Sequence, residues 1–99
     1  KIVIDPGIGG GNFGKNMTQN LNLLAHLNEF KAFNLPLLVG VSRKLFIGEL
    51  LDLPQEKRLY GSLGATVMAI NNGANIIRAH DVRATVEAIK VAIAIIRNK

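Results

Sequence analysis

Short apolar runs alternate along this chain with longer stretches in which apolar residues recur every three or four positions. The strands predicted from them cover residues 2–4, 37–41 and 75–79, and their length and their Ile and Val content are typical of buried strands. Strands that alternate with helices form parallel sheets, because each helix returns the chain to the same end of the sheet. The pattern therefore predicts an α/β fold with the order β-α-β-α-β-α and parallel strands.

The helical stretches are predicted at residues 18–33, 58–72 and 82–97. Each of them carries an apolar stripe along one face. The stripes consist of Leu21, Leu24, Leu27 and Phe30 in the first helix, Leu63, Val67 and Ile70 in the second, and Val86, Ile89, Ile93 and Ile96 in the third.

Particular residue types mark where these helices begin and end. Thr18 and Asp81 are expected to be N-caps, because their side-chain oxygens can accept hydrogen bonds from first-turn N–H groups. Asn34 and Gly73 are expected to end helices, because both residue types tolerate the left-handed conformation. Residues 46–57 are interrupted by glycine and proline, so we predict a loop there, with room for one helical turn.

The predicted strand ends recur at a near-constant step: 37 residues separate Asp5 from Ser42, and 38 separate Ser42 from His80. This is slightly longer than one unit of a (β/α)₈ TIM barrel, which has eight units in about 250 residues. A small open three-stranded sheet is the alternative, but its apolar strands would leave exposed edges that promote aggregation. Because the chain also opens directly on a strand without an initiator methionine, we expect residues 1–99 to be an incomplete barrel, a piece of something larger.

Composition narrows the function classes. An apolar fraction of 48% indicates a packed core. The absence of cysteine excludes disulfides and thiolate metal sites, and the two histidines, His26 and His80, are too far apart in sequence to indicate a metal cluster. No apolar run approaches the roughly 18 residues of a membrane span and no signal peptide precedes the first strand, so we expect a soluble, cytoplasmic protein without a membrane partner.

The net charge of +5 raises the possibility of nucleic-acid binding. Most of the cations, however, are scattered over positions where helix surfaces are predicted, and no aromatic-basic motif accompanies them. Only Arg43, Lys44 and Arg78 fall at strand ends. Ligands of parallel α/β folds bind at the carboxyl ends of strands, so an anionic small molecule fits better than nucleic acid.

The first predicted strand ends at Asp5, which opens a glycine-rich loop. A carboxylate at this place can accept two N–H groups from the edge of a pterin or guanine ring, and glycines let the backbone approach a ligand closely. The alternative is that Asp5 is a local turn residue in a connecting loop. The spacing Gly9-x-Gly11-x-x-Gly14 formally matches a dinucleotide fingerprint, but the acidic residue expected about 20 positions later is missing.

The second strand ends in Gly40-Val41-Ser42-Arg43-Lys44. Strand alternation places Gly40 and Ser42 on one face, where the small glycine leaves room for a flat ring. Lys44 can reach back with three donors, while Arg43 can pair with a carboxylate or cover the outer surface. The alternative is that both cations only serve solubility.

The third strand ends in Arg78-Ala79-His80-Asp81. Alternation places Arg78 and His80 on one face, so both can converge on one anion, and the helix that begins after Asp81 adds partial positive charge. A phosphate site after the last two strands is a recurring feature of barrels. The alternative is a core histidine beside an arginine that pairs with a buried carboxylate.

Together these motifs resemble dihydropteroate synthase. The resemblance is carried by Asp5-Pro6-Gly7, Phe13-Gly14-Lys15, Ser42-Arg43-Lys44 with Phe46-Ile47-Gly48, Arg58-Leu59-x-Gly61-Ser62-Leu63 and Arg78-x-His80-Asp81-Val82. It covers nearly the whole chain but only the last three βα units of the family's barrel, that is, its carboxyl-terminal part. The family condenses p-aminobenzoate with dihydropterin pyrophosphate in folate synthesis and releases pyrophosphate.

The resemblance also implies roles. The implied substrate-binding residues are Asp5, Phe13, Gly40, Ser42, Lys44, Arg78 and His80. The aspartate would hold the donor edge of the pterin, and the lysine would contact its ring beside the glycine. Phenylalanine and serine would bind the ring and the carboxylate of p-aminobenzoate, and arginine and histidine would hold the pyrophosphate. The implied Mg²⁺ has its ligand on the absent first strand, outside this chain.

One departure from the family lies in the first loop. The family usually reads Asp-Pro-Gly-[Ile/Phe]-Gly-Phe-Gly-Lys, so Gly10-Gly11-Asn12 is an insertion before Phe13. The chain alone is expected to turn over little or nothing. A pterin-binding methyltransferase domain ranks lower, because it has no reason to carry these strand-end motifs. The alternative from another class is a non-catalytic half-barrel module that self-associates, or docks on the missing half, through exposed strand edges.

Overall fold

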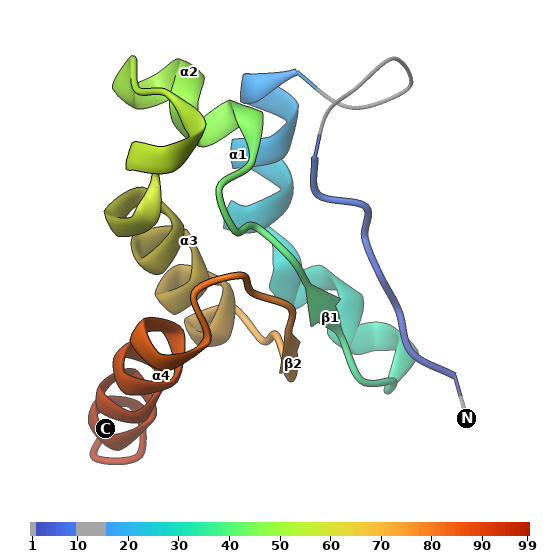
Figure 1. The fold of residues 1–99 in the computed structure, drawn as a ribbon. Coiled ribbons are helices and arrows are strands. Elements are labelled where there is room, and N and C mark those ends of the chain that lie inside the picture. The colour runs from blue at the N-terminus through green and yellow to red at the C-terminus, as the bar shows by residue number, and fades with distance from the viewer. Residues whose placement is uncertain (1, 10–15) are drawn as a thin grey trace.

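The computed structural model describes residues 2–9 and 16–99, and helices make up most of it (Figure 1). The elements in chain order are α1 (Met17–Ala25), the 3₁₀ helix η1 (Leu27–Phe33), β1 (Leu38–Val39), α2 (Leu45–Leu51), the 3₁₀ helix η2 (Gln55–Lys57), α3 (Leu59–Asn71), β2 (Ile76–Ile77) and α4 (Val82–Ile96). None of the helices in these two ranges has the length and apolar character that a membrane crossing requires.

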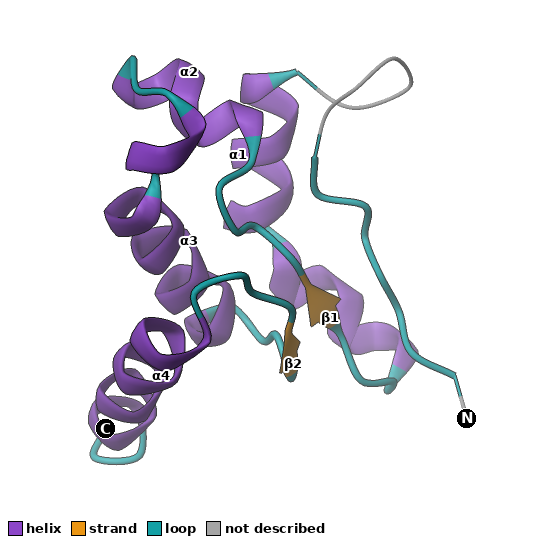
Figure 2. Cartoon of the chain, in the orientation of Figure 1, coloured by secondary structure: helices purple, strands orange, loops and turns teal. Residues whose placement is uncertain are grey.

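Three chain segments pair side by side and in parallel, as the sequence predicted (Figure 2). In β1 and β2, Leu38 is opposite Ile76 and Val39 is opposite Ile77. On the other side of β1, Ile4 forms a parallel bridge with Leu37. The Ile4 carbonyl accepts the Leu38 N–H at 2.8 Å. The α/β class and the parallel direction are therefore confirmed, although the regular strands are shorter than the apolar runs.

The core lies between these strands and the helices that cover them. Leu27 and Val39 are fully buried, and Val41, Phe46 and Ile47 pack in the same cluster. Helix α1 contacts both α2 and α3, and α3 lies along α4 (Figure 1). This arrangement leaves the loops after the strands at one end of the molecule.

The first helix differs from the prediction in its start and in its continuity. Asn16, not Thr18, is the N-cap: its side chain accepts the Gln19 N–H at 2.8 Å, and the Gln19 side chain accepts the Asn16 N–H at 2.9 Å. This reciprocal capping box satisfies two backbone donors, which a cap two residues later would leave exposed. The helix then ends at His26, and a 3₁₀ helix follows until Asn34, which has the expected left-handed conformation (φ 53°).

The prediction of a loop at residues 46–57 is wrong, because most of this segment forms α2 and η2. Phe46 and Ile47 are buried, and their burial in the core stabilises a helix that starts one residue earlier. Gly48 lies inside this helix, and the Arg58 side chain occupies the space that a Cβ at this position would need. Asp52 ends the helix in the left-handed conformation (φ 58°).

Helices α3 and α4 lie close to their predicted positions. Gly73 follows α3 with a φ of 114°, a conformation that suits glycine. Asp81 takes the N-cap position of α4 but makes no capping hydrogen bond, so that part of the prediction is wrong. Its carboxylate instead binds Arg43. In α3 the fully buried positions are small residues, Ser62 among them, rather than the predicted stripe.

Candidate functional site

A cavity of about 180 Å³ opens where β1 and β2 end. It is lined by Gly40, Ser42, Lys44, Arg78, Ala79 and His80. Five of these six are predicted site residues, and they come from two strand ends 38 positions apart in sequence. Asp5 is exposed at the neighbouring strand end, and its charge acts on Lys44. Phe13 and the insertion Gly10-Gly11-Asn12 lie outside the described residues.

Ser42 and His80 connect the two loops that form the cavity. The Ser42 hydroxyl oxygen accepts the backbone N–H of His80 at 3.1 Å. A hydroxyl that accepts one hydrogen bond keeps its own proton as a donor. The Ser42 proton can therefore be donated to an anionic group in the cavity.

Lys44 extends from the second loop to the first. Its Nζ donates a hydrogen bond to the Ile8 carbonyl, and a Cβ at Gly9 would come within 3.2 Å of the same nitrogen. Partial burial lowers the pKa of the Lys44 ammonium, the positive charge of Arg78 lowers it further, and Asp5 opposes both effects. An ammonium has three donors, so two can still bind a ligand beside the loop.

Arg78 lies over the backbone of Gly40. A Cβ at Gly40 would be 3.0 Å from Nη2 and 3.1 Å from Nε of Arg78. The space that the glycine was expected to leave for a flat ring is thus occupied by a guanidinium. Among the described residues the ion pairs are Arg43–Asp81 and Arg83–Glu87, so no carboxylate neutralises Arg78. Arg78 and His80 are both exposed, which argues against the alternative of a core pair.

Asp5 combines both roles considered for it. One carboxylate oxygen accepts the Gly7 N–H at 2.9 Å and closes a local turn. The residue is nevertheless exposed, which leaves its carboxylate within reach of a ligand. Asp5 can therefore still accept N–H groups from a ring that lies over the strand ends.

Asn20, which is not among the predicted site residues, holds the first loop in place. The side chain is almost completely buried, accepts the Gly9 N–H at 2.9 Å and donates to the Gly9 carbonyl at 3.1 Å. A polar residue on the buried side of a helix was the available signal, because buried amides need partners. The neighbouring leucines of the apolar stripe dominate the pattern of this helix, so the asparagine does not stand out.

The pair Arg43–Asp81 links the second loop to the start of α4. Arg43 Nε donates to one Asp81 oxygen at 3.0 Å and Nη2 to the other at 2.5 Å. These hydrogen bonds raise the pKa of Arg43 and hold the pKa of the Asp81 carboxyl below its usual value. Of the two uses that the sequence left open for Arg43, pairing with a carboxylate is the one that the structure shows.

The described residues do not form a metal site of their own. They contain no group of three or more His, Cys, Asp or Glu side chains that could hold an ion. The Asp81 carboxylate is engaged by Arg43. The side chains of the cavity suit an anion instead.

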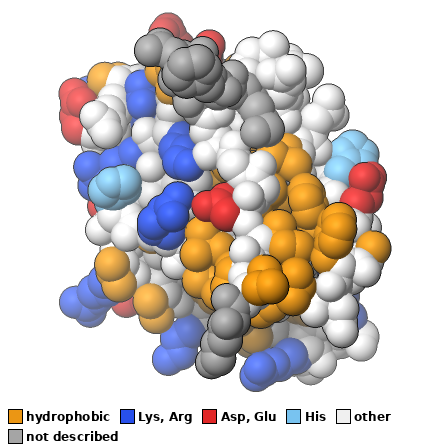
Figure 3. Space-filling model, turned by 90° about the vertical axis from the view of Figure 1, so that its right-hand side faces the viewer, with side chains coloured by type: hydrophobic (Ala, Val, Ile, Leu, Met, Phe, Trp, Pro, Cys, Tyr) orange, Lys and Arg blue, Asp and Glu red, His pale blue; other side chains and the backbone are white. Residues whose placement is uncertain are grey.

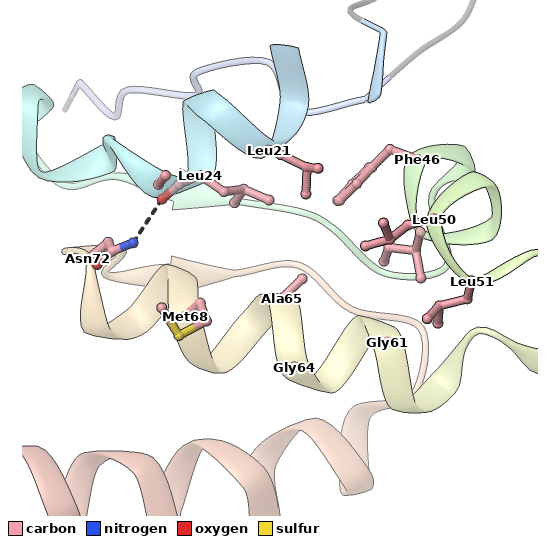
Figure 4. A pocket seen from close by; sticks show the side chains of 12 residues that line it. Leu21, Leu24, Phe46, Leu50, Leu51, Gly61, Gly64, Ala65, Met68 and Asn72 are labelled. Atoms are coloured by element: carbon pink, nitrogen blue, oxygen red, sulfur yellow. Dashed lines mark hydrogen bonds between the residues drawn. The ribbon is translucent and has the colours of Figure 1, made fainter. Parts of the chain in front are cut away.

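A larger cavity of about 310 Å³ lies between α1, α2 and α3 (Figure 4). Leucine side chains of α1 and α2, Phe46 and Met68 line it, and the hydrogen bond from Asn72 Nδ2 to the Leu24 carbonyl lies at one end. Its lining is almost wholly apolar and has no ionisable side chain. It offers no group for catalysis or for anion binding, whereas the smaller cavity at the strand ends gathers the cationic and hydroxyl side chains of two loops.

The chain is similar to known proteins over most of its length. Residues 1–80 match the family described as pterin binding enzyme. Dihydropteroate synthase of Escherichia coli is 56% identical over 91 residues, which are 92% of this chain and 31% of that protein. The chain thus spans about a third of the length of the curated relatives it matches.

Two solved structures show the same fold. The dihydropteroate synthase of Coxiella burnetii in complex with pteroic acid has a TM-score of 0.87 and 57% identity over 91% of this chain and 34% of that one. The Yersinia pestis dihydropteroate synthase in a sulfonamide drug complex has a TM-score of 0.91 and 48% identity over 98% of this chain and 34% of that one.

Proposed function

The chain belongs to the family of pterin binding enzymes, and on this basis we propose that it forms the carboxyl-terminal part of a dihydropteroate synthase. Its βα units are then consecutive units of a (β/α)₈ barrel. In the proposed reaction the amine nitrogen of p-aminobenzoate attacks the methylene carbon of dihydropterin pyrophosphate. A C–N bond forms, the C–O bond to pyrophosphate breaks, and the amine loses a proton. The observation that carries the proposal is the strand-end cavity with its cationic and hydroxyl lining.

Arg78 and His80 would bind the pyrophosphate. The Arg78 guanidinium has no carboxylate partner among the described residues, and its planar donors match phosphate oxygens in pairs. Negative charge builds up on the leaving oxygen as the C–O bond breaks. Donors already in place at that position stabilise the transition state more than the ground state.

Lys44 and Asp5 would orient the pterin. Two donors of the Lys44 ammonium remain beside the one that Ile8 accepts, and they can bind the acceptor atoms of the ring. The exposed Asp5 carboxylate can accept the ring's N–H groups from the neighbouring strand end. The Asp5 charge acts on Lys44 and raises its pKa, as expected of two side chains that face one ligand.

Ser42 would bind the carboxylate of p-aminobenzoate. Its oxygen already accepts the His80 N–H, which directs the hydroxyl proton toward another acceptor. Phe13 would pack near the aromatic ring of the same substrate, as the resemblance implies. The Mg²⁺ used with the diphosphate would take its protein ligand from outside this chain, and the role in folate synthesis implies a cytoplasmic location.

Exposed apolar side chains support association with further β/α units. Ile2 and Val3 of the first strand segment are 70% and 43% exposed, and Val91 and Ile95 of α4 are 63% and 62% exposed. Hydrophobic side chains gather on the side of the molecule where the amino-terminal segment lies (Figure 3). Apolar surface at an unpaired strand is a place where another chain segment docks. We therefore expect the remaining units of the barrel to cover it.

A hybrid enzyme tests the proposed function. In it, this chain replaces the matching third of the E. coli dihydropteroate synthase, and pyrophosphate release is measured with both substrates. We expect turnover, and a loss of about 10²–10³-fold when Arg78 and His80 are replaced by alanine. The control is Arg83→Ala, which removes an exposed cation on α4 and should leave turnover unchanged.

Two outcomes would contradict the proposal. A hybrid that folds like the parent enzyme, judged by circular dichroism, yet releases no pyrophosphate would refute it. A stable oligomer of the chain that does not bind pterin would instead support the non-catalytic module. The unmodified 99-residue chain is expected to show little or no turnover in the same assay.

A further inference from the structure

Arg43 has a backbone conformation that a non-glycine residue rarely adopts, with a φ of 56°. It lies between Ser42 and Lys44, the two residues of the second loop that line the cavity. A change at this residue would redirect the chain on both sides of it. The contacts that hold Arg43 therefore determine where the hydroxyl and the ammonium point.

Ser62 of α3 holds the N–H of Arg43. Its hydroxyl oxygen accepts that N–H at 2.7 Å and donates its own proton to the Arg58 carbonyl at 2.7 Å. Ser62 is buried, so water does not replace the hydroxyl when it is removed. The hydroxyl therefore both donates and accepts a hydrogen bond within the protein.

Arg58, which directly precedes α3, holds the carbonyl of Arg43. Its Nη1 donates to that carbonyl at 3.1 Å, and its Nε donates to the Leu53 carbonyl at 3.1 Å. The guanidinium packs against Gly48, where a Cβ would overlap it. The Arg58 side chain is thus fixed from two sides before it reaches Arg43.

Asp81 holds the side chain of Arg43 through the two hydrogen bonds described above. The N–H, the carbonyl and the guanidinium of one residue are therefore each bound by a different partner. A rare backbone conformation persists where the surroundings fix it in this way, and such places are concentrated at ligand sites.

We propose that Ser62, Arg58 and Asp81 form a clamp that keeps Arg43 left-handed and thereby positions Ser42 and Lys44 in the ligand cavity. The clamp residues are positioning residues, since none of them lines the cavity. Ser42 also accepts the His80 N–H, so a displaced Ser42 moves the loop that carries Arg78 and His80. The ligand class read out is therefore the diphosphate end of the substrate, which these two residues would bind, and this part of the inference rests on the proposed function. The resemblance assigns a role to Ser42 and Lys44 but not to the residues that hold the loop between them.

The test compares Ser62→Ala with Thr66→Ala in the isotope-labelled 99-residue chain. Both substitutions remove a buried hydroxyl from α3, one turn apart, but only Ser62 contacts Arg43. Two quantities are measured by NMR: hydrogen exchange of the Arg43 amide and binding of inorganic pyrophosphate. For Ser62→Ala we expect exchange about tenfold faster and affinity about five- to tenfold weaker.

The control Thr66→Ala is expected to lower the melting temperature but to leave both quantities within about twofold of the unsubstituted chain. Ser62→Thr, which keeps a hydroxyl, is expected to restore both. A second pair, Arg58→Gln and Lys57→Gln, removes one positive charge each and gives the same contrast if Ser62→Ala does not fold. Only Arg58 contacts the Arg43 carbonyl.

The outcomes separate the two proposals. If the unsubstituted chain binds pyrophosphate and Ser62→Ala binds it equally well, or leaves Arg43 exchange unchanged, the clamp is overturned and the proposed function stands. If the unsubstituted chain does not bind pyrophosphate, the proposed anion site is overturned. The exchange of the Arg43 amide then still decides whether Ser62 holds the loop.

Discussion

Replacing Gly40 by alanine is expected to weaken anion binding while leaving the fold intact. Gly40 is not among the residues with a left-handed backbone, so an alanine fits its conformation. The new Cβ would lie 3.0 Å from Nη2, 3.1 Å from Nε and 3.3 Å from Cζ of Arg78. These distances are shorter than ordinary van der Waals contact, so the exposed guanidinium must move by a few tenths of an ångström.

The size of the effect follows from what Arg78 contributes. A hydrogen bond to a charged group is worth about 1.5–3 kcal/mol, and it weakens as its geometry is lost. Losing roughly half of that value corresponds to about 0.75–1.5 kcal/mol, or a Kd for pyrophosphate that is about three- to tenfold higher. Stability should stay within about 1 kcal/mol, because a Gly→Ala change at a compatible conformation stabilises by about 0.4–1 kcal/mol and the displaced side chain is on the surface.

Calorimetric titration with pyrophosphate and urea unfolding measure these two quantities in the same samples. Gly64→Ala is the matched control, since a Cβ at this exposed position of α3 meets nothing within 4 Å. It should stabilise the helix by about 0.5–1 kcal/mol and leave the Kd unchanged. If Gly40→Ala binds pyrophosphate as tightly as the unsubstituted chain, the Arg78 guanidinium does not bind the anion in the position that it has over Gly40.

Three further predictions concern the core, the Arg43–Asp81 pair and Lys44. Leu27→Ala, at a fully buried position, should lower the free energy of unfolding by about 2–5 kcal/mol. The control Leu50→Ala, at a position that is 56% exposed, should lower it far less, and urea unfolding measures both variants. The hydrogen bonds from Arg43 lower the pKa of Asp81 in the folded protein. The pair therefore stabilises the fold fully above the pKa of an unfolded aspartate, about 3.9, and this stabilisation is lost as the pH falls through the folded pKa. Melting temperatures against pH should therefore fall less steeply in acid for Asp81→Asn, and an unchanged acid limb would contradict the pairing. The pKa of Lys44 is lowered by burial, so the free energy of unfolding should rise with pH between the folded and the unfolded pKa of this lysine. Bound pyrophosphate should raise the pKa of Lys44, and the ¹³C chemical shift of the Lys44 ε carbon measures it. An unchanged pKa on binding would mean that the anion binds elsewhere.

The parts of this structure that could be predicted are those that depend on local pattern. Apolar runs and helical spacing are enough to predict parallel pairing in chain order. Alternation along each strand is enough to place Gly40 with Ser42 and Arg78 with His80, and the parallel strand ends bring both pairs to one cavity. The start of α1 was predicted two residues late, because the Asn16–Gln19 capping box competes with a threonine that is also a good cap. Helix α2 was missed because its stability comes from core burial of Phe46 rather than from propensity.

The hydrogen bonds around the site could not be predicted, because they join residues that only the tertiary fold brings together. Ser62 and Arg43 are 19 positions apart, and Asn20 and Gly9 are 11 apart. A buried serine or asparagine in a helix shows that some partner exists, but the partner's identity depends on how the helix is turned. The position of the Arg78 side chain over Gly40 also depends on how the ends of the two strands pack.

The most direct test of the account is a chemical-shift map of a pterin pyrophosphate analogue on the isotope-labelled hybrid enzyme. We predict that the shifts concentrate at residues 40–44 and 78–80 and at Asp5, around the strand-end cavity. Shifts confined to the apolar cavity between α1, α2 and α3, or no shifts at saturating analogue, would contradict the assignment of the strand ends as the binding site.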